Sequence, residues 1–333
     1  MNNDRELINF KSRGWFLYPR GHRLSKGQEQ PKFRVNPRST GIVSSTTYEK
    51  HTLQQSLMLE AQELERCQQL GIHTGHIFPV RLIDFNEQEN QLTTERVSGN
   101  ELFLTIWNAT YTIGRLRGHT LSGMDIIIDR ITELGRWLRK YHNSSADSLP
   151  KDSDGSWMEA EFHRKIDDIR KSRLIPQAKL VKIEHKFGSE LSKLRQPGYL
   201  SANRAFPCRV HGDFLIYNIL IDNQHNLHIL DFGDTRISGN LEDVSRFYSS
   251  IWAIAQTNRT RRKLFGDLPQ RFLRAYGVSP EVINTPYFRC NLVYNFLTHL
   301  EGQHYMRDFL SWNSNREMTQ ITQAGMKWVY QQI

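Results

Sequence analysis

Hydrophobic and polar residues divide the chain into a short strand-rich part and a longer helix-rich part. Residues 10–47 contain short apolar runs separated by Gly, Pro, Ser and Lys, which is typical of strands and turns. From residue 48 to 70 leucines recur near the helical period, and Gly71 follows, which predicts a helix over 48–70. Two strands are predicted next, at 76–85 and 91–97, with a polar turn between them.

The helix-rich part begins where Ser-Gly-Asn-Glu-Leu, at residues 98–102, ends the strand pattern. Residues 125–142 then place Ile127, Ile131, Leu134 and Leu138 in one apolar stripe, the pattern of an amphipathic helix. Helices are also predicted over most of the remaining chain, including 157–171, 177–194, 241–256 and 287–311. This pattern divides the chain into residues 1–97 and residues 98–333.

One segment among these helices has the pattern of a hairpin and carries three polar residues of interest. The runs N-I-L-I-D and N-L-H-I-L-D-F are joined by the polar turn N-Q-H, so antiparallel pairing would bring Asn218 close to Asp231. Asp213 comes five residues before Asn218. Amide and carboxylate oxygens are ligands that Mg²⁺ prefers, and a nearby carboxylate can orient or deprotonate a hydroxyl. Taken singly, each residue could instead be a turn or cap residue.

Composition and charge narrow the class of protein. The 333 residues include 44 basic and 35 acidic side chains, a formal net charge of +9, which favours anionic partners such as nucleotide phosphates. The three cysteines are far apart in the sequence, which argues against a disulfide framework or structural zinc site and favours a reducing compartment. No apolar run approaches the ~20 residues that span a bilayer. We therefore expect a cytoplasmic protein without a transmembrane segment.

The order of the three polar residues suits phosphoryl transfer, which needs magnesium, a residue that orients the nucleophile and a cation on the phosphates. Protein kinases carry H-R-D-x-x-x-x-N followed by D-F-G. This chain reads H-G-D-F-L-I-Y-N from His211, then D-F-G thirteen residues after Asn218, then G-N-L-E-D-V. Over roughly residues 53–256 it resembles the aminoglycoside phosphotransferase and choline kinase group of enzymes. The resemblance implies an α+β, two-lobed protein-kinase-like fold with a small β-rich N-lobe (1–97) and a larger, mainly helical C-lobe (98–333).

The resemblance also implies roles for individual residues of the hairpin. Asp213 matches the catalytic Asp, and Asn218 and Asp231 match the two magnesium ligands. His211 matches a structural His of the loop, and Asp243 matches a later Asp that packs behind the loop.

For the nucleotide, the resemblance implies that Glu60 pairs with the phosphate-binding cation and that backbone groups of Glu95 and Val97 meet the base. The V-x-K strand that should supply this cation is not recognisable. We take Arg34, in K-F-R-V, as the cation, because Lys50 falls within the predicted helix 48–70. The predicted cofactor-binding residues are therefore Arg34, Glu60, Glu95 and Val97.

The resemblance implies a kinase that uses ATP (or GTP) and Mg²⁺ to phosphorylate a hydroxyl of a small molecule. Residues 244–333 carry 11 basic and five acidic side chains, and residues 151–210 carry 13 and eight. An enzyme for polycationic aminoglycosides would be expected to line this lobe with acids. We therefore predict a neutral or anionic acceptor, such as a sugar, glycolipid head group, nucleoside or metabolite.

Two other classes of function stay open. The missing Lys motif would fit a nucleotide-binding pseudokinase or scaffold. The basic helical lobe would fit a protein kinase or a lipid-surface kinase with weak membrane-surface association. We expect no specific nucleic-acid partner, because the basic run at 259–263 lacks interleaved aromatic residues and is interpreted as a solvated helix face. The oligomeric state is left open.

Overall fold

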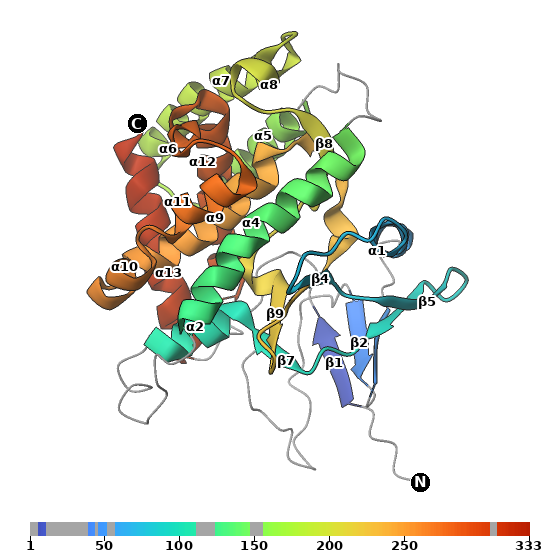
Figure 1. The fold of residues 1–333 in the computed structure, drawn as a ribbon. Helices are drawn as coiled ribbons and strands as arrows, with labels where there is room; N and C mark the ends of the chain where they lie inside the picture. Colours follow the sequence, from blue (N-terminus) through green and yellow to red (C-terminus); the bar gives the residue numbers. More distant parts are fainter. Residues whose placement is uncertain are drawn as a thin grey trace.

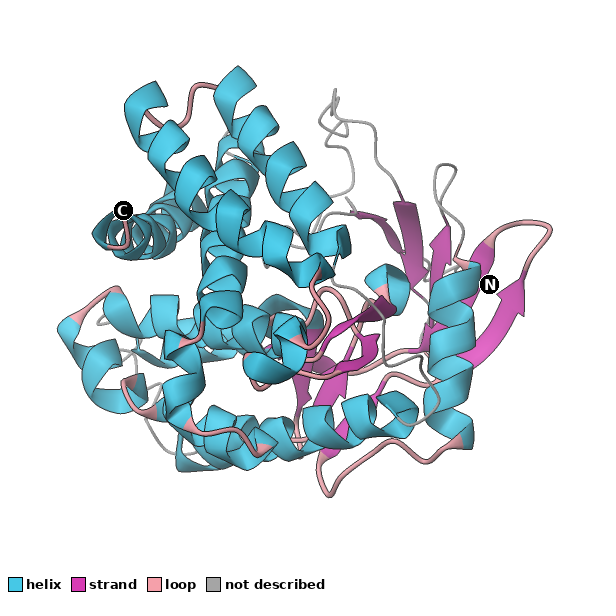
Figure 2. Cartoon of the chain, turned by 90° about the horizontal axis from the view of Figure 1, so that it is seen from above, coloured by secondary structure: helices cyan, strands magenta, loops and turns pink. Residues whose placement is uncertain are grey.

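Strands gather at one end of the molecule and helices at the other (Figures 1 and 2). The computed structural model describes residues 6–10, 39–43, 46–51, 57–110, 124–146, 156–306 and 312–333. Within these ranges the N-terminal part is strand-rich, and most of the chain beyond residue 101 is helical. The mixed α+β architecture predicted from the sequence is therefore confirmed. The division into lobes at residue 97 stays a prediction.

The first sheet is antiparallel throughout and places β3 (Thr47–His51) in its middle. The sequence prediction of a helix over 48–70 is wrong at its start, because Lys50 pairs with Gly41 on one side and with Leu92 on the other. The helix that follows is α1 (Met58–Gln69). The strand order is β1 (Glu6–Phe10), β2 (Ser39–Val43), β3, β6 (Gln91–Glu95) and β5 (Leu82–Asn86).

The second sheet contains the predicted hairpin, with β9 antiparallel to β10 and Ile219 opposite Ile229. Its order is β4 (Ile77–Pro79), β10 (Leu227–Ile229), β9 (Ile219–Asp222) and β7 (Gly99–Glu101). Two strand predictions are corrected here. The single strand expected at 76–85 is β4 and β5, which belong to different sheets. The stretch expected to end the strand pattern instead supplies β7, which pairs with β9.

A two-stranded ladder of β8 (Pro207–Val210) and β11 (Arg236–Gly239) brackets the hairpin. It joins the chain entering the hairpin to the chain leaving it, so the loops on either side of the hairpin are fixed to each other. Two short 3₁₀ turns lie between these strands, η3 (Ile216–Asn218) and η4 (Phe232–Asp234).

Long helices build the remainder of the molecule, and α4 crosses it diagonally in Figure 1. The predicted helix 125–142 is confirmed as α4 (Met124–Ala146), and its apolar stripe is buried. The helices before residue 205 are α2 (Leu102–Thr110), α4, α5 (Ser156–Lys171), α6 (Gln177–Ile183), the π-helical η1 (Glu184–Gly188), α7 (Ser189–Leu191), η2 (Ser192–Arg195) and α8 (Tyr199–Ala202). Those after it are α9 (Leu241–Gln256), α10 (Arg259–Phe265), α11 (Leu268–Tyr276), η5 (Pro280–Asn284), α12 (Pro286–Met306) and α13 (Trp312–Gln331).

The hydrophobic core passes directly beneath the loop that follows β8. The ring of Phe214 stacks on Trp137 of α4, with centroids 5.8 Å apart, and also contacts Phe247 of α9 at 5.4 Å. Aromatic pairs at such distances add about 0.5–1.5 kcal/mol each beyond their buried area. Because Phe214 is fully buried and adjoins Asp213, the core fixes the position of that carboxylate.

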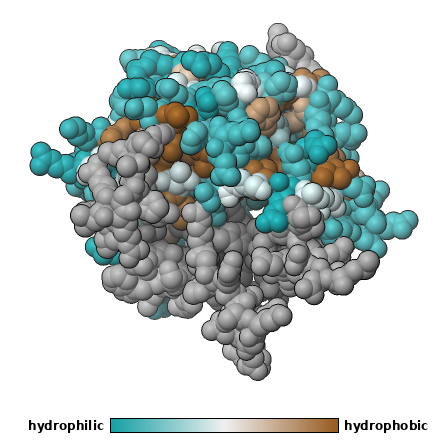
Figure 3. All heavy atoms as spheres, turned by 60° about the horizontal axis from the view of Figure 1, so that its bottom comes forward, coloured by the Kyte–Doolittle hydropathy of each residue, from teal (hydrophilic) through white to brown (hydrophobic). Residues whose placement is uncertain are grey.

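The described surface is mainly hydrophilic, with hydrophobic residues in separate patches on the face drawn in Figure 3. Among the helices of the described ranges, none combines the length and the apolar character that crossing a membrane requires.

Candidate active site

Lys50 on β3 forms an ion pair with two acids from distant parts of the chain. Its Nζ lies 2.7 Å from Oε2 of Glu60 on α1 and 2.9 Å from Oδ1 of Asp231 after β10. Burial opposes the charge of Lys50, but the carboxylates of Asp231 and Glu60 outweigh it and hold its pKa well above the ordinary value. Burial raises the pKa of Glu60, and Lys50 offsets this only in part. The contact fixes a cation beside the acid of the D-F-G motif.

This geometry bears on the sequence-based choice of the phosphate-binding cation. The sequence pattern places Lys50 in a helix, and this prediction is wrong, since Lys50 lies in β3, which ends at His51. Glu60, predicted as the partner of the cation, contacts Lys50. Arg34, the predicted cation, lies outside the described residues. The signal that could have identified Lys50 is the two-residue period of a strand. In T-Y-E-K this period puts Lys50 on the same face as the aromatic Tyr48.

The hairpin brings Asn218 and Asp231 to one end of the second sheet, as predicted. The backbone N–H of Leu230 donates to the carbonyl of Asn218 at 2.9 Å, so the two side chains start from adjoining positions. Asp231 has a left-handed backbone with φ 62°, and its side chain is 38% exposed, which leaves it open to a ligand. Burial works against ionisation of Asp231, but Lys50 outweighs it and holds the pKa of Asp231 below its ordinary value.

Asp213 lies within reach of Asn218 and is almost completely buried. The Asn218 amide nitrogen donates to Asp213 Oδ2 at 2.8 Å and to the Asp213 backbone carbonyl at 2.9 Å. Because both bonds use the nitrogen, the amide oxygen of Asn218 is not needed to hold its side chain in place. Burial raises the pKa of Asp213 to about 7, although Arg246 acts in the opposite direction. A pKa near neutrality is the value that a general base would need.

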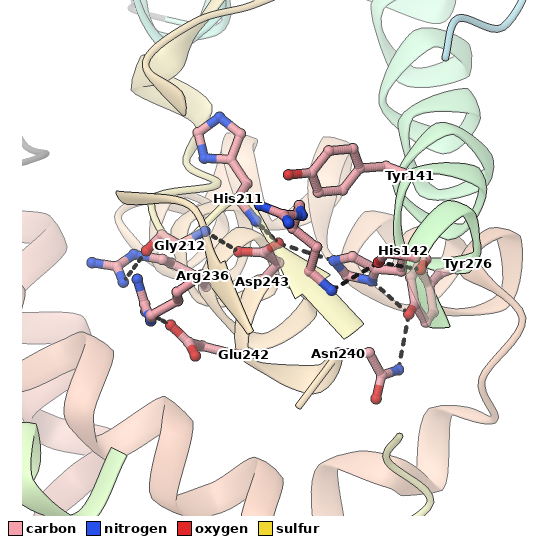
Figure 4. Close-up of polar contacts among 12 residues, drawn as sticks. Tyr141, His142, His211, Gly212, Arg236, Asn240, Glu242, Asp243 and Tyr276 are labelled. Atoms are coloured by element: carbon pink, nitrogen blue, oxygen red, sulfur yellow. Dashed lines mark hydrogen bonds and ion pairs between the residues drawn. The ribbon is translucent and has the colours of Figure 1, made fainter. Parts of the chain in front are cut away.

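The loop that carries Asp213 is held from behind by Asp243 of α9, which the sequence analysis assigned to a supporting role. Figure 4 shows Asp243 between the loop and His142. Its Oδ2 accepts from the N–H of His211 at 2.7 Å, and its Oδ1 accepts from the N–H of Gly212 at 2.9 Å. Gly212 has φ 81°, and a Cβ there would collide with the carbonyl of Asp234. The loop conformation therefore requires glycine at this position.

Two buried histidines complete the support of the loop. His142 Nε2 donates to Asp243 at 3.0 Å, and its Nδ1 lies 2.8 Å from the hydroxyl of Tyr276, which accepts from Asn240 (Figure 4). Burial lowers the pKa of His211, which favours the neutral ring, and its Nε2 donates to the carbonyl of Leu230. His211 thereby ties the loop to the strand that leads to Asp231.

The predicted adenine-binding residues lie at the end of β6, with Glu95 its last residue and Val97 two positions beyond. The N–H of Glu95 donates to the carbonyl of Arg81, and the N–H of Arg96 donates to the carbonyl of Thr46, both at 2.9 Å. Val97 N–H donates to no backbone carbonyl of the residues that the structure describes. The N–H of Glu95 is therefore engaged within the protein, and the Glu95 carbonyl and the Val97 N–H are the candidate groups for the base.

Four side chains thus converge from a strand of the first sheet and from both ends of the hairpin: Lys50, Asn218, Asp231 and Asp213.

A family model described as "Phosphotransferase enzyme family" matches residues 20–286. The chain belongs to this family. The family match confirms the predicted enzyme class, a phosphotransferase with an alcohol group as acceptor, and the predicted likeness to aminoglycoside phosphotransferases and choline kinases. No curated relative matches the phosphotransferase by sequence.

Solved structures similar to the phosphotransferase confirm its protein-kinase-like fold. A glucosamine kinase shares 13% identity and a TM-score of 0.58, with 87% of this chain and 77% of that chain covered. The same enzyme in complex with glucosamine, ADP and inorganic phosphate gives the same TM-score, with 88% and 79% covered. Choline kinase LicA from Streptococcus pneumoniae shares 10% identity and a TM-score of 0.50, with 89% and 91% covered. At these identities the likeness concerns the fold alone.

Lys50→Met is expected to lower kcat/KM for the nucleotide by about 10- to 100-fold, because a hydrogen bond to a charged group contributes about 1.5–3 kcal/mol. Steady-state kinetics with varied nucleotide would measure the loss. Arg34→Met is the matched variant and should stay within about three-fold of the wild type. A larger loss in Arg34→Met than in Lys50→Met would restore Arg34 as the phosphate-binding cation.

Proposed function

We propose that this phosphotransferase moves the γ-phosphate of ATP, in the presence of Mg²⁺, to a hydroxyl of a neutral or anionic small molecule. The observation that carries the proposal is the approach of Lys50 and Asp231 to within 2.9 Å of each other, next to the loop of Asp213 and Asn218. Phosphoryl transfer needs a cation, oxygen ligands for magnesium and a residue for the nucleophile. These four side chains supply all three.

The residues present fit magnesium. The Asp231 carboxylate and the Asn218 amide oxygen are hard oxygen donors at one end of the hairpin, and Mg²⁺ typically binds one or two carboxylates together with substrate phosphates. When bound, the ion would neutralise negative charge on the phosphates. Lys50 would hold the phosphates from the side of the first sheet. The backbone carbonyl of Glu95 and the N–H of Val97 would meet the base.

Asp213 would receive the proton of the acceptor hydroxyl. The O–H bond breaks toward the carboxylate, the hydroxyl oxygen forms a bond to the γ-phosphorus, and the bond from that phosphorus to the bridging oxygen breaks to release ADP. Asp213 must be ionised at the start of this step, which its pKa of about 7 allows at neutral pH.

The acceptor class is inferred from charge. The segments of the helical lobe carry excess basic residues, and the charge of Arg246, which lies 3.1 Å from Asp213, helps to lower the pKa of a second guanidinium, Arg236. A polycationic acceptor would be repelled from this region. The similar fold of a glucosamine kinase, solved with glucosamine and ADP, is a further reason to test sugars first.

The test is ATP turnover by the full chain against neutral sugars, sugar acids, nucleosides and aminoglycosides, with the phosphorylated product identified by mass spectrometry. Transfer to a neutral or anionic hydroxyl compound is expected. Preferred transfer to aminoglycosides would contradict the acceptor class. Tight ATP binding without any transfer would favour the pseudokinase alternative, although the contact of Lys50 with Glu60 weakens the sequence-based reason for it. Salt-sensitive binding to anionic vesicles would favour the lipid-surface alternative.

A further inference from the structure

Arg246 lies one turn beyond Asp243 on α9 and contacts the same loop. Its Nη1 donates to the carbonyl of Gly212 at 2.7 Å, and its Nη2 lies 3.1 Å from Oδ1 of Asp213. Positions three apart share a helix face, so Asp243 and Arg246 face the loop together. Asp243 accepts from the loop's N–H groups, whereas Arg246 contacts the carbonyl and the carboxylate that follow. Helix α9 therefore holds both the backbone and the acid of the loop.

Arg246 keeps its charge in a buried position. Only 7% of the residue is exposed, and burial alone would lower its pKa, but Asp213 and other nearby groups raise it above the ordinary value. His299 of α12 faces the same guanidinium. Burial, followed by the charge of Arg246, lowers the pKa of His299 well below its usual value, so His299 adds no second positive charge there. A buried charge is costly unless it is paired, and the acid that pairs with Arg246 is Asp213.

The two oxygens of Asp213 have different surroundings. Oδ2 accepts the hydrogen bond from Asn218, while Oδ1 lies within ion-pair distance of Arg246 but accepts no well-directed hydrogen bond from any described residue. A buried carboxylate oxygen without a hydrogen bond is uncommon in native proteins and calls for an explanation. The hydroxyl of an acceptor is a donor of the kind that Oδ1 lacks. Among the described residues, the ion pair with Arg246 is therefore the contact that holds Oδ1 in this buried position.

We propose that Arg246 is a positioning residue that holds Asp213 with Oδ1 directed to the acceptor hydroxyl. The proposal rests on the phosphotransfer function above and adds a residue that the motif does not contain. Arg246 acts through Asp213 alone and touches neither nucleotide nor acceptor. Without it, the carboxylate would keep its bond to Asn218 but could turn about that bond, and Oδ1 would lose its fixed direction.

Arg246→Met is expected to lower kcat about 100-fold, the cost of misplacing a reacting group by about 1 Å, with the KM for ATP within about two-fold of the wild type. Arg246→Lys should retain more activity, because an ammonium can still reach one of the two oxygens. In an Asp213→Asn background, Arg246→Met should change the residual rate by less than about two-fold, since residues that act as a unit are not additive. Added guanidinium ion should restore part of the activity of Arg246→Ala.

Arg261→Met is the matched control. Arg261 lies on α10 rather than α9, is also buried, and donates to the hydroxyls of Thr110 and Thr257. It should lower the thermal midpoint without lowering kcat per folded enzyme. If Arg246→Met does not fold, Arg246→Lys supplies the same comparison. Wild-type kcat in Arg246→Met, or an equal loss in both backgrounds, would overturn this inference alone. A wild-type chain that phosphorylates no acceptor would overturn the proposed function and this inference with it.

Discussion

Asp213→Asn should reduce kcat by about 10²- to 10⁴-fold, the usual contribution of a general base, while the protein stays folded. Asparagine has the same shape and can still accept the hydrogen bond from Asn218, so the loop should keep its conformation. What disappears is the carboxylate that takes the hydroxyl proton. Single-turnover kinetics with the acceptor found in the panel would separate this loss from changes in nucleotide binding.

The pH dependence of kcat should identify Asp213 as the group concerned. Burial raises the pKa of Asp213 to about 7, with Arg246 opposing the rise. The ionised form, which acts as the base, predominates above this pKa, so kcat should be high above about pH 7 and should fall as the pH drops below it. Asp213→Asn should show no such fall in its residual activity.

Asp222→Asn is the control for this pair of measurements. Asp222 belongs to the same hairpin, but its carboxylate accepts from the N–H groups of Gln224 and Asn226 in the turn, far along the hairpin from Asp213. Its kcat and pH profile should match those of the wild type. An Asp213→Asn variant with kcat within about three-fold of the wild type would remove Asp213 from the role of base.

The hairpin and α4 could be predicted from the sequence because their patterns are local. The apolar runs on either side of N-Q-H fix the pairing of β9 with β10, and the spacing from Asp213 to Asn218 and Asp231 lies within one continuous segment. The stripe of α4 repeats over about three turns, so no tertiary contact is needed to identify it.

Lys50 could not be placed in the same way, because the residues around it carry a helical pattern and one partner of its strand is far away in sequence. The hydroxyl residues before it look like a helix cap, and the leucines after it continue the helical period. Residues 47–51 form a strand by pairing with β2 just before them and with β6, where Leu92 lies more than 40 residues later, and only the fold brings Asp231 to Lys50.

Arg246 was missed for a different reason. The sequence pattern predicts that an arginine among the polar residues of a helix is exposed to solvent. Its buried contacts are with Gly212 and Asp213, which are more than 30 residues away in the sequence. Nothing in the local pattern distinguishes it from Arg262, which is exposed on α10. Support of a catalytic loop from behind is a property of tertiary packing, so sequence motifs reveal the loop more readily than the residues that hold it.

Asp243→Asn should lower the free energy of unfolding by about 3–5 kcal/mol, the range for removing one partner from a buried charged network. The Asp243 carboxylate accepts from three donors: the N–H groups of His211 and Gly212 and the ring of His142. An amide presents an NH₂ group to at least one of these donors, which leaves two donors facing each other in a buried site. Urea unfolding at pH 7 would measure the difference.

The direction in which the free energy of unfolding changes with pH follows from the pKa of Asp243. Burial would raise it, but the hydrogen bond from His142 and the neighbouring histidines and amides outweigh burial and lower it. The unfolded value is about 4. Ionised Asp243 therefore contributes stability that is fully present above about pH 4 and is lost as the pH falls through the lower folded-state pKa. The stability difference between wild type and Asp243→Asn should accordingly shrink as unfolding is measured at progressively lower pH.

Asp267→Asn provides the comparison, because Asp267 is also an acid at the start of a helix but is 59% exposed and pairs with Arg271 on the surface. Surface pairs of this kind contribute about 0–1 kcal/mol. If Asp243 only favoured the N-terminus of α9, both variants would be destabilised by similar small amounts. A loss several times larger in Asp243→Asn, with kcat falling as well, would show that its carboxylate holds the loop of Asp213. Equal losses would reduce Asp243 to an ordinary helix-terminal acid.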